Sequence, residues 1–352
     1  MAYDLYDRVL GGLIGAAAGD GMGAATEART TEQIKDYFGD LVRDFETPPN
    51  DTFARGNPPG RATDDFSSAY FIARGIVQNG GAVDKRAVAD ALIAWSEYGD
   101  GVFFDRFAGP TTRLAIRRFK GEAIAETHGV RIVSRQATNG GAMRVSPIGL
   151  LNPGDPEKTV QDSLAVVMLT HDNYLAISGA CAISCAVSQA LMPDADVYNI
   201  LQAAFYGARE GERLGLAYAN DTPGPSVLRR MEKAVEIGLG EGSFEEKIRD
   251  IGEIIGAGLH VSEAVPAAIG FFAAAKGDAA GTIFGAVNVG YDTDTIATMC
   301  GAIAGAYRGA AAFPAHYLPL LEKANGLDIQ ELARGIAAIA AARSGLPGGP
   351  KI

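Results

Sequence analysis

The sequence predicts an all-α fold, arranged as one compact helical bundle. Apolar residues recur at the spacing of one helix face, as in Leu5, Val9 and Leu13. Sustained alternation of apolar and polar residues, which marks half-buried strands, is nearly absent. No linker or shift in composition divides the helical segments, so we expect a single domain over residues 1–352 with the short connections of a bundle.

Glycine rows mark two of the expected helices as central. In each row glycine recurs every fourth residue, which lets another backbone approach one face of the helix. The two rows are Gly11, Gly15 and Gly19 near the start, and Gly301, Gly305 and Gly309 near the end.

Capping signals delimit most of the remaining helices. Residues 46–61 are rich in Pro, Gly and Asn and are expected to form a long loop, of the kind that is often functional. The residues expected to cap helices are Thr30 with Gln33, Asp84, Asp155, and Ser243 with Glu246.

Composition narrows the class of protein. The formal charge is −11, from 31 basic and 42 acidic residues, and no basic run is present, so sequence-independent nucleic-acid binding is not expected. Three cysteines argue against a disulfide scaffold and fit a reducing compartment. Cys181 and Cys185, one turn apart, are expected in the core.

The N-terminal segment does not resemble a signal peptide, because Asp4 and Asp7 stand where basic residues would be needed. No uninterrupted apolar segment reaches the roughly twenty residues that span a membrane. We therefore expect a cytoplasmic protein without a membrane partner.

Two short segments rich in carboxylates and hydroxyls carry the chemical signal. One is Gly-Tyr-Asp-Thr-Asp-Thr at 290–295 and the other is Thr-Asp-Asp at 63–65. Carboxylates two positions apart cannot share one face of a helix, but they converge if a loop feeds a helix N-terminus. Hard cations such as Mg²⁺, Mn²⁺ or Ca²⁺ prefer such oxygen ligands. The same residues also suit caps, with Asp65 and Asp294 expected to precede helices at Phe66 and Ile296.

Four further features remain open from the residues alone. The Gly-rich segment 138–144 fits an ordinary turn, or an anion site at the start of a helix that ends near Leu151. His171 precedes a long apolar helix. It fits a residue at the helix boundary whose two ring nitrogens are hydrogen-bonded within the protein, and it also fits a site residue. Asp20, in the Gly-rich turn expected there, should accept hydrogen bonds from backbone amides. Arg144 fits an internal ion pair as well as a role in the Gly-rich segment.

Five segments in this order resemble the ADP-ribosylglycohydrolase family. The family includes the dinitrogenase reductase-activating glycohydrolase and ADP-ribosyl-acceptor hydrolases. The matching segments are Gly19 to Glu27, Thr63 to Asp65, Asn139 to Arg144, Thr170-His171, and Gly290 to Ala297. Each motif is weak alone, but the ordered set is specific and spans nearly the whole chain.

The resemblance implies a metal-dependent hydrolase with two divalent cations, Mg²⁺ or Mn²⁺. Four converging carboxylates would repel one another without such ions, and their pKa values would rise. The implied metal ligands are Thr63, Asp64, Asp65, Asp292, Asp294 and Thr295. Glu27 and Asp294 are the implied catalytic residues. The implied substrate-binding residues are Asn139, Gly140, Gly141, Met143 and His171.

The chain departs from the family pattern at two places, and the second of them affects the expected substrate. Phe66 replaces the usual threonine, which is not expected to be a ligand. Gln136 and Ala137 replace a Ser-Tyr pair, so an aromatic that could stack on adenine is missing there. Phe103 or Phe104 would be substitutes, although both also fit buried core positions.

The expected reaction is hydrolysis of the N- or O-glycosidic bond at the ribose anomeric carbon of an ADP-ribosylated protein or small molecule. One alternative is a nucleosidase-like hydrolase of a smaller riboside. Another is a non-catalytic module that binds ADP-ribose. A metal-free glycosidase that uses two carboxylates agrees less well with the two acidic segments, because it gives no role to Thr63 and Thr295.

Overall fold

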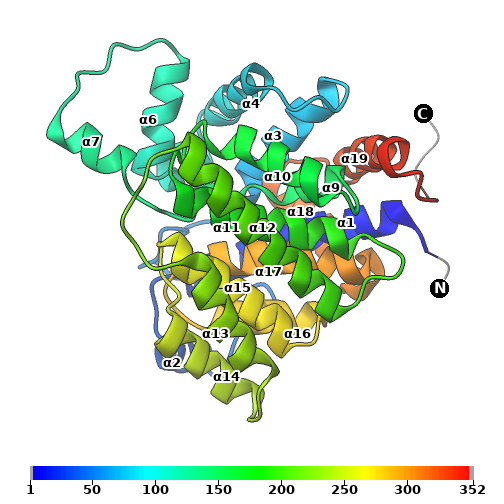
Figure 1. Ribbon diagram of the computed structural model, residues 1–352. Coiled ribbons are helices and arrows are strands. Elements are labelled where there is room, and N and C mark those ends of the chain that lie inside the picture. The colour runs from blue at the N-terminus through cyan, green and yellow to red at the C-terminus, as the bar shows by residue number, and fades with distance from the viewer. Residues whose placement is uncertain (1–2, 349–352) are drawn as a thin grey trace.

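The computed structural model describes residues 3–348, and these form helices without a sheet (Figure 1), which confirms the all-α prediction. The helices are α1 (Leu5–Thr26), α2 (Thr31–Phe38), α3 (Asp64–Gln78), α4 (Lys85–Glu97), α5 (Phe104–Phe107), α6 (Pro110–Phe119), α7 (His128–Ser134), α8 (Gly140–Met143), α9 (Ser146–Leu151), α10 (Pro156–Val167), α11 (Tyr174–Ala190), α12 (Val197–Tyr218), α13 (Val227–Leu239), α14 (Phe244–Asp250), the π-helical turn η1 (Ile251–Ile255), α15 (Val261–Ala274), α16 (Ala279–Asn288), α17 (Thr293–Arg308), the 3₁₀ turn η2 (Ala310–Ala312), α18 (Tyr317–Asn325) and α19 (Ile329–Ser344).

The two glycine-row helices, α1 and α17, pack directly against each other at the centre of the bundle (Figure 1). A Cβ atom added to Gly15 would lie 2.0 Å from the carbonyl oxygen of Gly301, and one added to Gly301 would lie 2.3 Å from that of Gly15. Both distances are too short for any side chain. The glycine rows are therefore required by backbone contact, and the prediction that both helices are tightly packed is confirmed.

The expected turn at Gly19 to Gly23 is wrong, because α1 continues through these glycines to Thr26. Glycine is a poor helix former on its own, but here tertiary contact decides the conformation. A Cβ at Gly19 would lie 2.2 Å from the carbonyl oxygen of Ala297, and one at Gly23 would lie 2.4 Å from the Cα atom of Asp294. The C-terminal end of α1 is thereby pressed against the first turn of α17, which brings Glu27 toward Asp294.

Most local capping predictions are confirmed, including the complete capping box of Thr30 with Gln33. The expected caps Asp65 and Asp294 are wrong, because both helices begin earlier. Thr63 caps α3 with its hydroxyl, and Asp292 occupies the cap position of α17 without a side-chain bond. Both expected caps therefore lie inside the first helical turn, where their carboxylates can face other groups.

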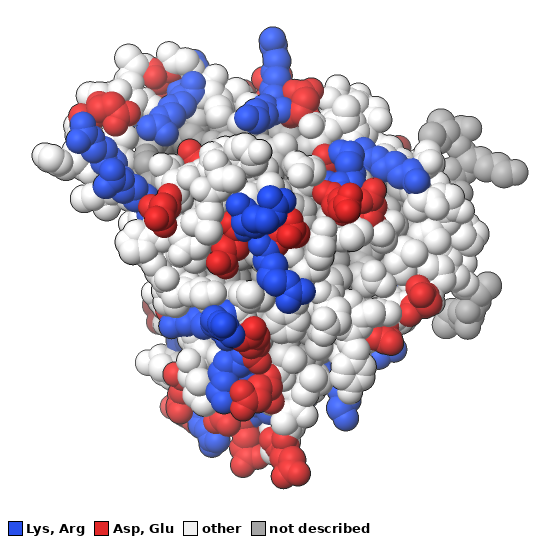
Figure 2. All heavy atoms as spheres, in the orientation of Figure 1, with Lys and Arg blue, Asp and Glu red and all other residues white. Residues whose placement is uncertain are grey.

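The three cysteines are free and buried, as expected for core residues. Within the described residues, no helix combines the length and apolarity needed to cross a bilayer. Figure 2 shows basic and acidic side chains interspersed over one face of the molecule. Many such charges pair locally, as Arg229 and Glu232 do at 3.0 Å.

Candidate active site and metal centre

The first turns of α3 and α17 and the end of α1 bring five carboxylates together, which we call the acidic cluster: Glu27, Asp64, Asp65, Asp292 and Asp294. Oxygens of Glu27, Asp292 and Asp294 lie within 4.8 Å of one another. Asp65 on α3 is close enough for its charge to raise the pKa of Asp294 on α17. The two segments recognised in the sequence thus converge on one place.

Asp20 holds the start of α3 in position. Its two carboxylate oxygens accept hydrogen bonds from the backbone amides of Thr63, at 2.9 Å, and Phe66, at 2.8 Å. The Thr63 hydroxyl accepts from the Asp65 amide at 3.2 Å and lies 3.0 Å from an Asp65 carboxylate oxygen, to which it donates. Asp20 does bond backbone amides, as expected, but those of another helix rather than of its own segment.

The acidic cluster has the properties of a cation site. Oδ1 of Asp65 and Oδ1 of Asp294 are buried and have no hydrogen-bond partner among the described residues. Burial raises the pKa values of Asp65 and Asp294 well above the usual value of an aspartate, and the charges of the neighbouring carboxylates raise both pKa values further. Unpaired buried oxygens and mutual repulsion are what divalent cations would relieve, so the residues present fit such ions.

Glu27 is half-buried, as Asp64 is, and ends α1, where its amide donates to the Gly23 carbonyl at 2.9 Å. Burial, followed by the charges of Asp292 and Asp64, raises the pKa of Glu27 to about 8. A carboxyl with a pKa near neutrality is suited to exchange a proton with water or substrate.

Asn139 links the glycine-rich segment to the cluster. Its side-chain amide donates to Oδ2 of Asp292, and its backbone amide donates to the Leu259 carbonyl at 3.0 Å. The expected turn at 138–144 is in fact one turn of helix, α8, preceded by an isolated bridge between Thr138 and His260. Among the implied substrate residues, Asn139 is the one that bonds a cluster carboxylate.

His171 lies behind the glycines of α8. Its Nδ1 is 2.8 Å from the Thr170 hydroxyl and its Nε2 is 3.0 Å from the Thr138 hydroxyl. A Cβ at Gly140 would lie 2.7 Å from the His171 Nε2. Burial lowers the pKa of His171 to about 3, so the ring is neutral. Its contacts with Thr138 and Gly140 support α8, in which Gly141 and Met143 are also buried.

The aromatic substitutes considered from the sequence do not offer an open ring. Phe103 is fully buried and stacks on Tyr98 with ring centroids 5.9 Å apart. Phe104 packs edge-on against Trp95 at 5.4 Å. Ala137 is also buried, at 4% exposure, so a tyrosine placed there would overpack the core instead of adding a stacking surface.

A backbone strap not anticipated from the sequence joins the loops beside Glu27 and Asp292. We define the strap as residues 28–30 and 290–291. The Ala28 amide donates to the Tyr291 carbonyl at 2.8 Å, and the Tyr291 amide donates to the Arg29 carbonyl at 2.9 Å. Ala28 and Tyr291 both have positive φ, 61° and 66°, which is uncommon for residues with a side chain. Such outliers concentrate at functional sites, and only coordinates reveal them.

Arg144 is buried close enough to Asp64 to affect its ionisation. Burial raises the pKa of Asp64 to about 6, and the Arg144 guanidinium opposes this shift. Arg144 donates to the Thr112 hydroxyl at 3.1 Å, while its Nε and Nη1 have no partner among the described residues. It therefore supplies positive charge to the cluster without forming the internal ion pair considered above.

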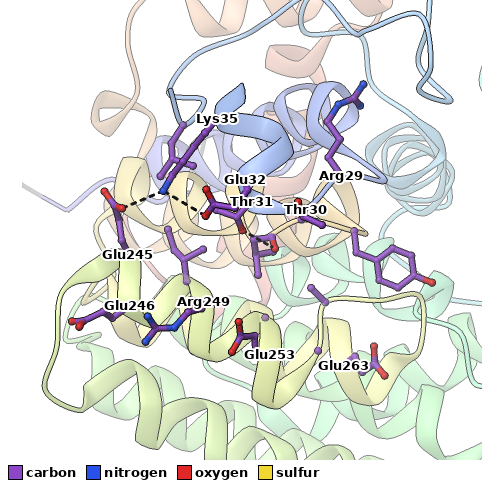
Figure 3. Close-up of a pocket in the computed structure, with 18 of the residues that line it drawn as sticks. Arg29, Thr30, Thr31, Glu32, Lys35, Glu245, Glu246, Arg249, Glu253 and Glu263 are labelled. Carbon is purple, nitrogen blue, oxygen red and sulfur yellow. Dashed lines mark hydrogen bonds and ion pairs between the residues drawn. The ribbon is translucent and has the colours of Figure 1, made fainter. Parts of the chain in front are cut away.

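A groove of about 940 Å³ borders the strap (Figure 3). Arg29, Gly290 and Tyr291 line it together with residues of α2, α14 and η1, but the cluster carboxylates do not. In the close-up, Lys35 lies between Glu32 and Glu245, at 3.9 and 3.5 Å. The groove is thus a neighbour of the acidic cluster and is separate from it.

The metal-free protein is expected to lose stability as pH rises from about 6.5 to 8.5. Folding raises the pKa of Glu27 from 4.5 to about 8 and that of Asp20 from 3.8 to about 7, mainly through burial. The folded state then binds more protons than the unfolded state, so the stabilisation is complete below the unfolded values and is lost as pH passes the folded values. His171 acts oppositely below 6.5, which sets the lower limit of the window.

This expectation is tested by melting temperatures in chelator at pH 6.5 and 8.5, repeated with millimolar Mn²⁺. The metal should remove most of the decline, since cations stabilise the ionised carboxylates. A melting temperature that stays level or rises with pH in chelator would contradict the expected repulsion.

Comparisons with known proteins agree over nearly the whole chain. A family model described as ADP-ribosylglycohydrolase matches residues 1–345. An uncharacterized protein, YegU of Escherichia coli (strain K12), is 30% identical over 334 residues, covering 94% of this chain and 96% of that protein. The ADP-ribosylhydrolase ARH3 of Bos taurus is 28% identical over 346 residues, covering 87% and 86%. A solved structure titled ADP-ribosylglycohydrolase-related protein complex has a similar fold, with a TM-score of 0.62 and 23% identity over 96% of this chain and 99% of that one.

Proposed function

Because the chain belongs to the ADP-ribosylglycohydrolase family, a family of glycosidic-bond hydrolases, we propose that it cleaves the bond between the ribose anomeric carbon of an ADP-ribosyl group and its acceptor atom. The supporting observation is the convergence of two acidic segments with Glu27, including two buried oxygens that lack partners. The acceptor bond is an N- or O-glycosidic bond of a modified protein or small molecule.

We propose that the cluster holds two divalent cations, Mg²⁺ or Mn²⁺. When bound, these ions supply positive charge that neutralises the carboxylates, polarises water and orients the ribose hydroxyls. Asp20 keeps the first turn of α3 in place, and Asn139 orients the carboxylate of Asp292. The proposed ligands are Thr63, Asp64 and Asp65 on one side, and Asp292, Asp294 and Thr295 on the other.

Glu27 is proposed to act on the attacking water. In the reaction the water oxygen bonds to the anomeric carbon, and the bond to the acceptor breaks with its electron pair going to the acceptor atom. The acceptor takes up a proton from solvent, which balances the proton that the attacking water loses. The ionised carboxylate of Glu27 accepts a proton from the water. Asp294, next to Glu27, is proposed to stabilise the positive charge that develops on the ribose ring.

Asn139 to Met143 and His171 are proposed to shape the subsite for ribose and phosphate. The bond from Asn139 to Asp292 supports this, because it ties α8 to the acidic cluster. The contacts of His171 with Thr138 and Gly140 support a role in holding α8 from behind.

A second candidate, hydrolysis of a smaller riboside, is favoured by one observation. Exposed Gln136 and buried Ala137 stand where an adenine-stacking aromatic was expected, so that segment offers no ring to a distal base. A non-catalytic ADP-ribose-binding module is the third possibility, and the intact acidic cluster disfavours it.

A product assay separates these functions. ADP-ribosylated arginine and serine peptides and a panel of free nucleosides are incubated with Mg²⁺, Mn²⁺ or chelator. We expect release of ADP-ribose from at least one peptide with metal and none in chelator. Cleavage of nucleosides alone would support the smaller riboside, and binding of ADP-ribose without any cleavage would support the non-catalytic module.

A further inference from the structure

Tyr291 combines an uncommon backbone conformation with an open aromatic ring. It immediately precedes Asp292, its φ is 66°, and 55% of the residue is exposed. A bulky residue in this left-handed region costs free energy compared with glycine. The strap bonds at both its amide and its carbonyl hold this backbone conformation.

The ring of Tyr291 packs on the backbone of Gly258, which we call the seat. A Cβ atom at Gly258 would lie 2.4 Å from Cε1 of Tyr291, so the ring edge packs directly on that backbone. The Gly258 amide donates to the Glu263 carboxylate at 3.1 Å, and Glu263 in turn pairs with Arg230 at 3.6 Å. One edge of the ring is thus supported, while more than half of the residue faces solvent.

The seat lies between the two parts of the proposed site. The Asp292 amide donates to the Ala257 carbonyl at 2.9 Å, and the Asn139 amide donates to the Leu259 carbonyl at 3.0 Å. Residues 257–259 therefore connect the acidic cluster to α8. Leu259, which follows the seat, is 53% exposed. The side chains of Tyr291 and Leu259 thus flank Gly258, at the point where the chain connects the acidic cluster to α8.

Other aromatic residues near the site are less suited to stack on a ligand. Phe103 and Phe104 are packed in the core or against it. Tyr37 is 57% exposed, but the Arg29 guanidinium lies over its ring at 5.1 Å. Phe53 is 56% exposed and lies in the long loop, and among the described residues no hydrogen bond joins it to the acidic cluster or α8. Tyr291 is exposed, and backbone hydrogen bonds of neighbouring residues connect it to both the acidic cluster and α8.

We infer that Tyr291 and Leu259 form a stacking platform for the adenine base of the ADP-ribosyl group. The inference rests on the proposed function and goes beyond it, because it names the residues that distinguish ADP-ribose from a smaller riboside. A planar base gains stacking energy on an aromatic face whatever its hydrogen-bonding edge. The platform takes the place of the aromatic that Gln136 and Ala137 do not supply.

The test compares the affinities of ADP-ribose and ribose 5-phosphate in the presence of Mn²⁺, measured by calorimetry. Tyr291→Asn removes the ring and keeps a residue that tolerates positive φ. It should weaken ADP-ribose roughly 5- to 160-fold, the range expected for one lost base–aromatic stack, and change ribose 5-phosphate less than about twofold. Tyr291→Phe should bind both ligands as the wild type does. Tyr198→Ala, which removes an exposed tyrosine on α12, is the matched control.

The outcomes separate the inference from the proposed function. If the wild type binds neither ligand, the proposed function fails. If ADP-ribose binds and both Tyr291→Asn and Leu259→Ala leave its affinity unchanged, the platform alone is overturned. If Tyr291→Asn weakens both ligands equally, Leu259→Ala decides, because a selective loss of ADP-ribose supports the platform and no selective loss overturns it. A selective loss in Phe53→Ala, without one in Tyr291→Asn, would also overturn it.

Discussion

Asp294→Asn is expected to lower turnover on the order of 10³-fold while making the metal-free protein no less stable at pH 8. Asp294 is 5% exposed and its Oδ1 has no partner, while Glu27, Asp65 and Asp292 add to the burial that raises its pKa. A neutral amide relieves this repulsion but removes one proposed ligand, and cations in such sites supply several kcal/mol of transition-state stabilisation.

Steady-state kinetics measure the loss of turnover, melting temperatures with and without metal measure the stability, and calorimetry measures the binding of Mn²⁺. Saturating metal should stabilise the wild type by RT ln(1 + [L]/Kd), about 2.7 kcal/mol at 100 times Kd, and the variant should lose that gain. Asp162→Asn is a matched control, because Asp162 is a buried carboxylate bonded to Asn152 and Lys158 instead of the cluster. It should lower the melting temperature and leave turnover unchanged. Full-strength Mn²⁺ binding by an Asp65→Asn, Asp294→Asn double variant would remove the metal assignment.

Glu27→Gln is expected to lower kcat by about 10²- to 10⁴-fold, the usual contribution of a positioned acid or base, with little change in KM. The substitution keeps the size of the side chain and removes the charge. It leaves the backbone bond that ends α1 in place, and it removes a carboxylate that faces Asp292 and Asp64. The melting temperature of the metal-free variant should therefore be equal to or above that of the wild type at pH 8.

The readout is steady-state kinetics on the substrate found in the product assay, together with the Mn²⁺ affinity. Glu241→Gln, on an exposed glutamate, should behave as the wild type. A kcat within about twofold of the wild type would exclude Glu27 from the chemistry. A large rise in KM with unchanged kcat would assign it to substrate binding instead.

Local signals in the sequence were sufficient for the fold class and many helix ends. The capping boxes at Thr30 and Ser243 join residues three positions apart, so the whole interaction is contained in one short stretch. The glycine rows indicated close helix packing for the same reason, since a repeat of four places every glycine on one helix face. The two acidic segments were also visible, because their ligand-type residues are adjacent in the chain.

The sequence alone did not determine how these segments meet. It suggested a turn at Gly19 to Gly23, where packing against α17 keeps a helix, and it placed the caps of α3 and α17 two residues too late. It also did not show that Ala137, where an adenine-stacking aromatic was expected, is buried by the fold.

What only the tertiary structure decided are the contacts between residues distant in the chain. Thr26 and Thr293, 267 positions apart, share a hydrogen bond at 3.0 Å where α1 meets α17, beside the acidic cluster. The Asp20 clamp on α3, the strap with positive φ at Tyr291 and the seat at Gly258 are of the same kind. Short-range propensity is a property of a few neighbouring residues, whereas these contacts exist only after two helix surfaces have excluded water and fixed their register.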